Sequence, residues 1–125
     1  MQLLFSHANG YPPDSYRVLL TSLSENLGVP VSTHAHRPLV SDEPPPTFLT
    51  WQTYASDLIE RIGGDERGPV WLIGHSMGAA SAVLAASRRP DLFAGIVALD
   101  PVLVPTHIWF GPECSLFSSP MQSPL

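Results

Sequence analysis

The segment VWLIGHSMGAASAVLAA, Val70 to Ala86, carries the clearest structural signal in the chain. Its first residues form the short apolar run of a buried strand, and its second half, from Met77, has the composition and spacing of a helix. Between them stands Ser76, with Gly74 two residues before it and Gly78 two residues after it. A strand that turns sharply into a helix strains the central residue and requires small neighbours. The segment therefore predicts a strand, a tight turn with an exposed serine, and a helix.

Short apolar runs and helical patterns alternate along the rest of the chain. Gly28 is expected to end the first helix and Asp14 to cap its start. The predicted strands are residues 2–6, 29–35, 69–74 and 95–100, and the predicted helices are residues 14–27, from Thr47 or Thr50 to 62, and 77–88. Apolar strands separated by helices are typical of an α/β fold, in which a parallel sheet is buried on both faces under helices. We expect a partial core of four strands and three helices.

Composition limits the function classes. A chain of 125 residues with 44% apolar residues fits one domain, and a net charge of −5 with scattered arginines does not favour nucleic acid or an anionic membrane. No apolar run reaches the length of a membrane span. The lone Cys114 cannot form an internal disulfide, so a cytoplasmic protein is expected. We expect the core in residues 1–105 and an irregular tail in residues 106–125.

The pentapeptide GHSMG, residues 74–78, fits the G-x-S-x-G nucleophile elbow, whose serine stands at the carboxyl edge of a sheet. The predicted strand before it and helix after it are the context that this motif requires. The helix start would direct unpaired N–H groups and a positive dipole at an oxyanion, with the N–H of Met77 as the first donor. The alternative is an ordinary tight turn in which Ser76 caps the helix.

Three motifs give the chain a family resemblance: HANG at residues 7–10, GHSMG at 74–78 and LDP at 99–101. Over residues 1–105 the chain resembles the amino-terminal portion of the α/β-hydrolase superfamily. The resemblance implies the strand order second, first, third, fourth along this chain. It also implies that the N–H of Asn9 completes the oxyanion hole, that His7 belongs to the oxyanion loop, and that Ala8 replaces the more usual glycine. The tail would then lie where the family begins its cap.

The partners of Ser76 are harder to assign. In the family the triad histidine follows later strands, which this chain does not reach. Asp100 ends the strand next to the elbow strand and is a candidate triad acid, and the alternative is that it caps the following turn. His7 is the nearest substitute base, whereas His75 is expected to face away from Ser76 as a packed or hydrogen-bonded core histidine.

His34 and His36 share one face of a strand end, but no third metal ligand accompanies them. We expect neither a metal nor a cofactor.

The leading hypothesis is a serine hydrolase that cleaves a small-molecule carboxylic ester, thioester or amide through an acyl-enzyme, with Ser76 as nucleophile. One alternative is a truncated, catalytically inactive hydrolase fragment that self-associates through its unpaired sheet edges. Another is a non-catalytic module that keeps the crevice and binds an acyl ligand.

Overall fold

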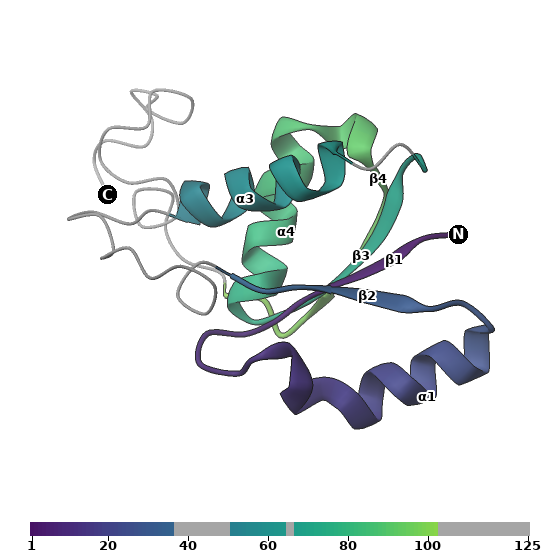
Figure 1. Cartoon of the computed structure of the whole chain (residues 1–125). Coiled ribbons are helices and arrows are strands. Elements are labelled where there is room, and N and C mark those ends of the chain that lie inside the picture. Colours follow the sequence, from purple (N-terminus) through teal and green to yellow (C-terminus); the bar gives the residue numbers. More distant parts are fainter. Residues whose placement is uncertain (37–50, 65–66, 103–125) are drawn as a thin grey trace, which may run out of the picture.

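The computed structural model describes residues 1–36, 51–64 and 67–102, and all structural statements concern these ranges (Figure 1). Four strands and three α-helices alternate along them. In chain order the elements are β1 (Leu3–Ser6), the 3₁₀ helix η1 (Pro13–Tyr16), α1 (Arg17–Leu27), β2 (Val31–His34), α3 (Trp51–Gly63), β3 (Val70–His75), α4 (Met77–Arg88), the 3₁₀ helix η2 (Pro90–Leu92) and β4 (Phe93–Leu99).

The strands form one parallel sheet in the order β2-β1-β3-β4. β1 lies at the centre, with Phe5 opposite Thr33 of β2 on one side and Ile73 of β3 on the other. After β1 the chain places β2 on one side of β1 and then β3 on the other side, so the order of the strands reverses between β1 and β3. At such a reversal the connections after the two strands diverge, which leaves a crevice at their carboxyl ends. The predicted fold class and strand order are confirmed.

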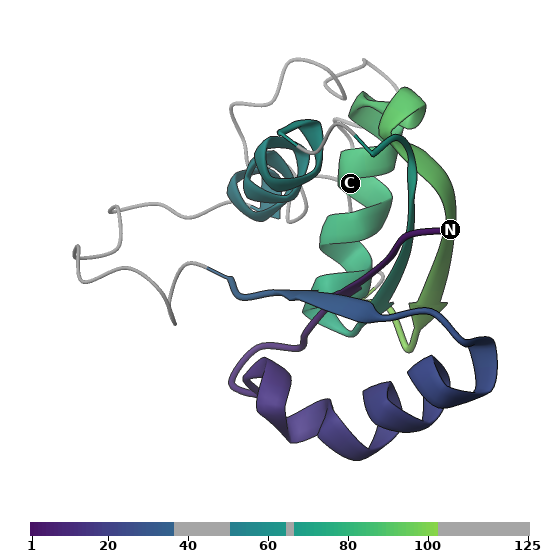
Figure 2. The ribbon, with the colours of Figure 1, turned by 45° about the vertical axis from the view of Figure 1, so that its right-hand side comes forward.

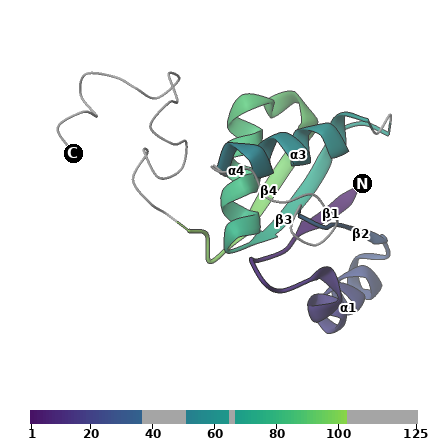
Figure 3. The same ribbon diagram turned by 60° about the vertical axis from the view of Figure 1, so that its left-hand side comes forward.

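Helices cover both faces of the sheet, as predicted. α1 lies on one face, and α3 and α4 lie on the other (Figures 1 and 2). The same division is visible in Figure 3, after rotation in the opposite sense. Side chains alternate along each strand, so Leu4 and Leu72 pack toward α3 and α4, whereas Phe5 and Ile73 pack toward Leu20 of α1. The two apolar layers fix the register of the sheet because a one-residue slip would exchange them.

β4 departs from the prediction of a strand buried on both faces. On the face that carries α1, Val97 is 43% exposed and Leu99 is 39% exposed. α1 lies against β2, and the apolar cluster beneath it takes residues from β1, β2 and β3 but none from β4. Trp71 of β3 lies over Gly95 there and is itself 39% exposed. The apolar composition of β4 identified a strand correctly but did not reveal which part of it the described helices cover.

The observed ends of the helices can be compared with the predicted capping residues. Gly28 ends α1 as predicted, with a left-handed φ of 67° and an N–H that donates to the Ser24 carbonyl at 2.8 Å. The prediction of Asp14 as the cap is wrong, because Asp14 lies inside η1 and α1 begins after Tyr16 without a side-chain cap. Thr47 and Thr50 lie outside the described residues, as does the expected tail in residues 106–125.

Gly78 allows the first turn of α4 to lie directly against the end of β1. A Cβ at this position would overlap the backbone carbonyl of Ser6 and would lie 2.6 Å from the His7 carbonyl oxygen. Gly74 is equally confined, since a Cβ there would lie 2.6 Å from the Ala79 Cα. Both obstacles are backbone atoms, so no side-chain rotation can relieve them.

A cluster of buried histidines lies where β1 and β2 end. The His36 ring is fully buried, with centroid distances of 4.7 Å to His7, 4.9 Å to His34 and 5.3 Å to Tyr54 of α3. Ser6 Oγ lies 2.9 Å from His36 Nε2. Nε2 of His34 and Nδ1 of His36 are buried and have no hydrogen-bond partner among the residues that the structure describes. These rings are therefore packed as neutral groups.

The charge state of the cluster follows from burial. Burial lowers the pKa of His34 to about 4, with Asp57 raising it and Arg61 and His7 lowering it further. Burial lowers the pKa of His36 to about 3, and the neighbouring His34 and His7 act in the same direction. Protonation of either ring therefore favours the unfolded chain.

We expect Gly78→Ala to lower the free energy of unfolding by about 2 kcal/mol or more, because the added methyl meets backbone rather than a movable side chain. Gly63→Ala at the end of α3 is the matched control. An added Cβ meets nothing there within 4 Å, and the change should stay within about 0.5 kcal/mol. Urea unfolding followed by circular dichroism measures both. Equal effects of the two substitutions would contradict the close approach of α4 to β1.

We expect the free energy of unfolding to fall as the pH is lowered from about 6.5 toward 4. In this window the unfolded histidines bind protons and the folded His34 and His36 do not, so stability is complete above the unfolded pKa. Each histidine contributes a slope of up to about 1.4 kcal/mol per pH unit. Denaturant midpoints measured at several pH values should show a smaller slope in His34→Gln. A stability that stays constant between pH 7 and 5 would disprove this assignment.

Candidate active site

Ser76 occupies a strained turn between β3 and α4. Its φ of 53° and ψ of −113° lie near the values of the first central residue of a type II′ turn, a position dominated by glycine. Gly74 and Gly78 are the small neighbours that so sharp a turn requires. Sequence reasoning predicted this geometry, and Ser76 stands half-buried at the carboxyl edge of the sheet.

The hydroxyl of Ser76 does not cap α4. Its Oγ makes no hydrogen bond to any residue in the described ranges, so the reading of Ser76 as an ordinary capping serine is not supported. The backbone N–H of Ser76 instead donates to the Leu99 carbonyl of β4 at 3.0 Å. Met77 is the first residue of α4, so its N–H has no carbonyl acceptor within the helix. This end of a 12-residue helix carries the positive pole of its dipole.

The HANG loop after β1 is a type II turn. The N–H of Tyr11 donates to the Ala8 carbonyl at 3.2 Å, and Gly10, at the third position of the turn, has a φ of 80°. Asn9, at the second position, has no positive φ. Gly10 is therefore required by the turn, whereas the Asn9 side chain is exposed and not part of the turn's hydrogen bonding.

His7 fixes the orientation of the peptide that joins Ala8 to Asn9. The N–H of His36 donates to His7 Nε2 at 2.9 Å, which leaves the His7 proton on Nδ1 to be donated to the Ala8 carbonyl at 2.7 Å. In a trans peptide the carbonyl oxygen and the following N–H point in opposite directions. The Asn9 N–H is therefore turned away from the His7 ring. Since both ring nitrogens of His7 are engaged, His7 is not available as a base for Ser76.

A second side chain that contacts this loop, Tyr16 of η1, was missed by sequence reasoning. Tyr16 accepts a hydrogen bond from the Ala8 N–H at 3.0 Å and lies 2.8 Å from Nδ1 of His75, the residue before Ser76. The sequence pattern assigned Tyr16 only to the apolar face of a helix. A usable signal existed, because a tyrosine on a packed face must place its hydroxyl against a polar partner. His75, as expected, is a hydrogen-bonded histidine on the face that carries α1.

Asp100 immediately follows the β4 carbonyl that accepts the Ser76 N–H, so its backbone lies beside the elbow. Its φ of 47° makes it, with Ser76, one of two non-glycine residues with positive φ in the described ranges. Its side chain is exposed and has no hydrogen-bond partner there. The alternative role as a turn cap therefore has no support in this part of the chain.

No imidazole in the described ranges is hydrogen-bonded to Ser76. His34 and His36 lie on the far side of β1, in the buried cluster at the end of β2. His107 and Cys114 lie outside the described residues. Across the same ranges, no three His, Cys, Asp or Glu side chains are grouped closely enough to bind a metal ion, and none of the helices is long and apolar enough to cross a membrane.

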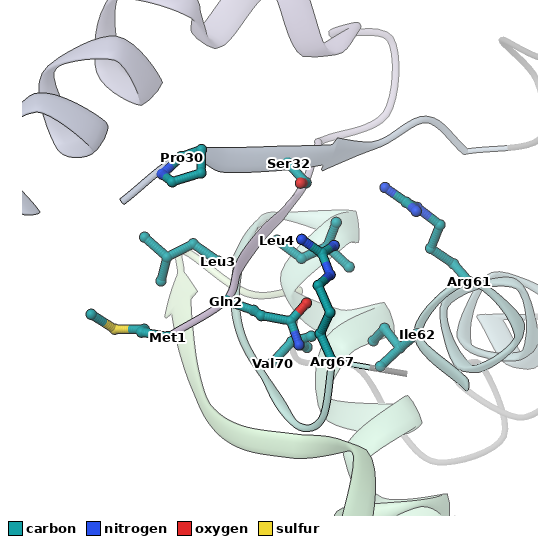
Figure 4. A pocket seen from close by; sticks show the side chains of 10 residues that line it. All are labelled: Met1, Gln2, Leu3, Leu4, Pro30, Ser32, Arg61, Ile62, Arg67 and Val70. Atoms are coloured by element: carbon teal, nitrogen blue, oxygen red, sulfur yellow. The ribbon is translucent and has the colours of Figure 1, made fainter. Parts of the chain in front are cut away.

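A small pocket lies away from the elbow. Its lining includes Gln2, Ser32, Arg61 and Val70, from the starts of β1 and β3, from β2 and from α3 (Figure 4). Ligands of open parallel sheets bind at the carboxyl ends of the strands. The position of this pocket therefore does not favour it as the reaction site.

Comparisons with known proteins agree with this geometry. The chain is 30% identical over 115 residues to human monoglyceride lipase, a match that covers 82% of this chain and 35% of the lipase. It is 33% identical over 99 residues to the 2-(acetamidomethylene)succinate hydrolase of Mesorhizobium japonicum, covering 78% of this chain and 34% of that enzyme. The chain thus spans about a third of the length of these curated relatives.

Solved structures show the same fold. A pyrethroid hydrolase from Sphingobium faniae superimposes with a TM-score of 0.63 at 22% identity, over 83% of this chain and 41% of the hydrolase. The sequence also matches the alpha/beta hydrolase family over residues 3–124. With its parallel sheet, its β2-β1-β3-β4 order and its elbow after β3, the chain belongs to the alpha/beta hydrolase family.

Proposed function

We propose that this chain provides the nucleophile and the oxyanion hole of a serine hydrolase that cleaves carboxylic esters through an acyl-enzyme. The observation that carries the proposal is the positive φ of Ser76, in a turn that leaves its hydroxyl uncapped at the start of α4. A serine held in such a conformation is typical of a functional site. Of the two relatives, human monoglyceride lipase supports an ester as substrate.

In the proposed reaction, Ser76 Oγ attacks the carbonyl carbon of the ester and the carbonyl oxygen becomes an oxyanion. The N–H groups of Met77 and Asn9 donate to this oxyanion, one from each side of the crevice between β1 and β3. Collapse of the intermediate expels the alcohol, and water then releases the acid from the serine. His7 contributes by holding the Ala8 carbonyl, and hence the Asn9 N–H, in one orientation.

The proton of Ser76 requires a base, and Asp100 is proposed as the acid that orients it. Asp100 suits this role because its exposed carboxylate follows the carbonyl to which the elbow is bonded. No imidazole in the described part of the chain is hydrogen-bonded to Ser76, so an imidazole supplied from solution is the appropriate substitute in a test. The same observation favours, as a second candidate, a module that binds an acyl ligand without turnover.

We expect a fluorophosphonate probe to label the protein at Ser76, and added imidazole to accelerate the labelling by accepting the hydroxyl proton. Intact-mass spectrometry follows the adduct. Ser76→Ala should abolish the adduct, and Ser15→Ala, at an exposed position on η1, should not affect it. A folded sample that gains no Ser76-dependent adduct with or without imidazole would refute the hydrolase proposal and favour the binding module.

We expect Asn9→Pro to reduce the labelling rate by about 10²- to 10³-fold, the effect of removing one oxyanion donor. Proline is favoured at the second position of a type II turn, so the substitution removes the N–H and preserves the turn. Asn9→Ala keeps the N–H and should label at the wild-type rate. Thermal melts confirm that both variants fold. Equal rates for the two variants would exclude the Asn9 N–H from the oxyanion hole.

A further inference from the structure

Two segments must keep a fixed separation if the proposed oxyanion hole is to work. One is the HANG loop after β1, which carries the Asn9 N–H, and the other is the elbow after β3, which carries the Met77 N–H. β1 and β3 are paired only as far as Ser6 and Gly74. Beyond that pair no sheet pairing joins the two segments, although Gly78 of α4 packs against the backbone of Ser6 and His7.

The Tyr16 hydroxyl joins these two segments. It accepts the N–H of Ala8 at 3.0 Å, and its own proton is then free to be donated to Nδ1 of His75 at 2.8 Å. Both distances are those of well-formed hydrogen bonds. One oxygen atom therefore connects the residue before Asn9 to the residue before Ser76.

The Tyr16 ring is itself held in place. It packs against Phe5 of β1 at a centroid distance of 4.5 Å and meets the His75 ring edge-on at 5.7 Å. Tyr16 is the last residue of η1 and directly precedes α1. The ring contacts thus restrict the position of the Tyr16 hydroxyl.

We infer that Tyr16 is a positioning residue, which sets the separation of the two oxyanion donors by bonding Ala8 and His75 at once. The inference rests on the proposed function, and it adds a residue to which no catalytic motif of the chain points. His7 holds the carbonyl of Ala8 and Tyr16 holds its N–H, so both peptide groups of Ala8 are restrained. Loss of the Tyr16 hydroxyl frees one of them and leaves the ring packing unchanged.

The test uses Tyr16→Phe, which keeps the ring and removes only the oxygen. Tyr11→Phe is the matched control, because Tyr11 precedes η1 by two residues and is 59% exposed. Nitrogen-15 NMR of the His75 ring should show the proton on Nε2 and a hydrogen-bonded Nδ1 in the wild type and in Tyr11→Phe. In Tyr16→Phe the hydrogen-bonded Nδ1 signal should be lost, and the Ala8 amide should exchange roughly tenfold faster, as expected for one lost hydrogen bond.

The kinetic readout is the labelling of Ser76 by the fluorophosphonate in the presence of imidazole. We expect Tyr16→Phe to lower the first-order labelling step about tenfold or more without changing the half-saturating probe concentration, since small displacements of catalytic groups cost up to about 10²-fold. Tyr11→Phe should match the wild type. The melting temperature of each variant separates a positioning effect from unfolding.

The outcomes distinguish this inference from the proposed function. If the wild type is not labelled but Tyr16→Phe alters the NMR signals of Ala8, Asn9 and His75, the proposed function fails and the positioning role stands. If Tyr16→Phe folds and is labelled at the wild-type rate, the positioning role is overturned and the proposed function stands. Unaltered NMR signals of Ala8 and His75 in Tyr16→Phe would also overturn it.

Discussion

The contact between the first turn of α4 and the end of β1 is the constraint on which the rest of the structure depends. It exists because Gly78 has no side chain to separate the helix from the backbone of Ser6 and His7. The helix can then start immediately after β3, which forces Ser76 into its turn and brings the positive end of the helix dipole to the carboxyl edge of the sheet. The HANG loop starts at His7, which is part of this contact. The contact therefore brings together the two segments that carry the candidate oxyanion donors.

Much of the fold was predictable because its signals are local. The apolar runs, the Gly28 stop and the spacing of Gly74, Ser76 and Gly78 each reflect steric rules that act within a few residues. The strand order came from the family resemblance. The exposure of Val97 and Leu99 was not predictable, since it depends on how far α1 extends over the sheet. Asp14 failed as a cap because a 3₁₀ turn precedes α1, and propensity alone does not separate these two starts.

The candidate site shows the same division. Ser76 and the HANG loop were found from motifs, whereas the hydrogen bonds that orient the loop were not. The backbone N–H of His36 donates to the His7 ring across 29 residues of sequence, and the Tyr16 oxygen accepts the N–H of Ala8 across 8 residues. In each of these two bonds the donor is a backbone N–H, which carries no sequence signature. Hydrogen-bond networks of this kind depend on three-dimensional contacts, so they are the part of a site that is hardest to predict from a single sequence.

The dihedral angles of Ser76 also bear on the stability of the protein. At φ 53° a side chain beyond Cα costs on the order of 1–2 kcal/mol relative to glycine, and the hydroxyl gains no compensating cap to α4. The fold on its own would be more stable with glycine at this position. At the elbow, the backbone conformation thus favours glycine for stability, but the sequence has a serine with an uncapped hydroxyl.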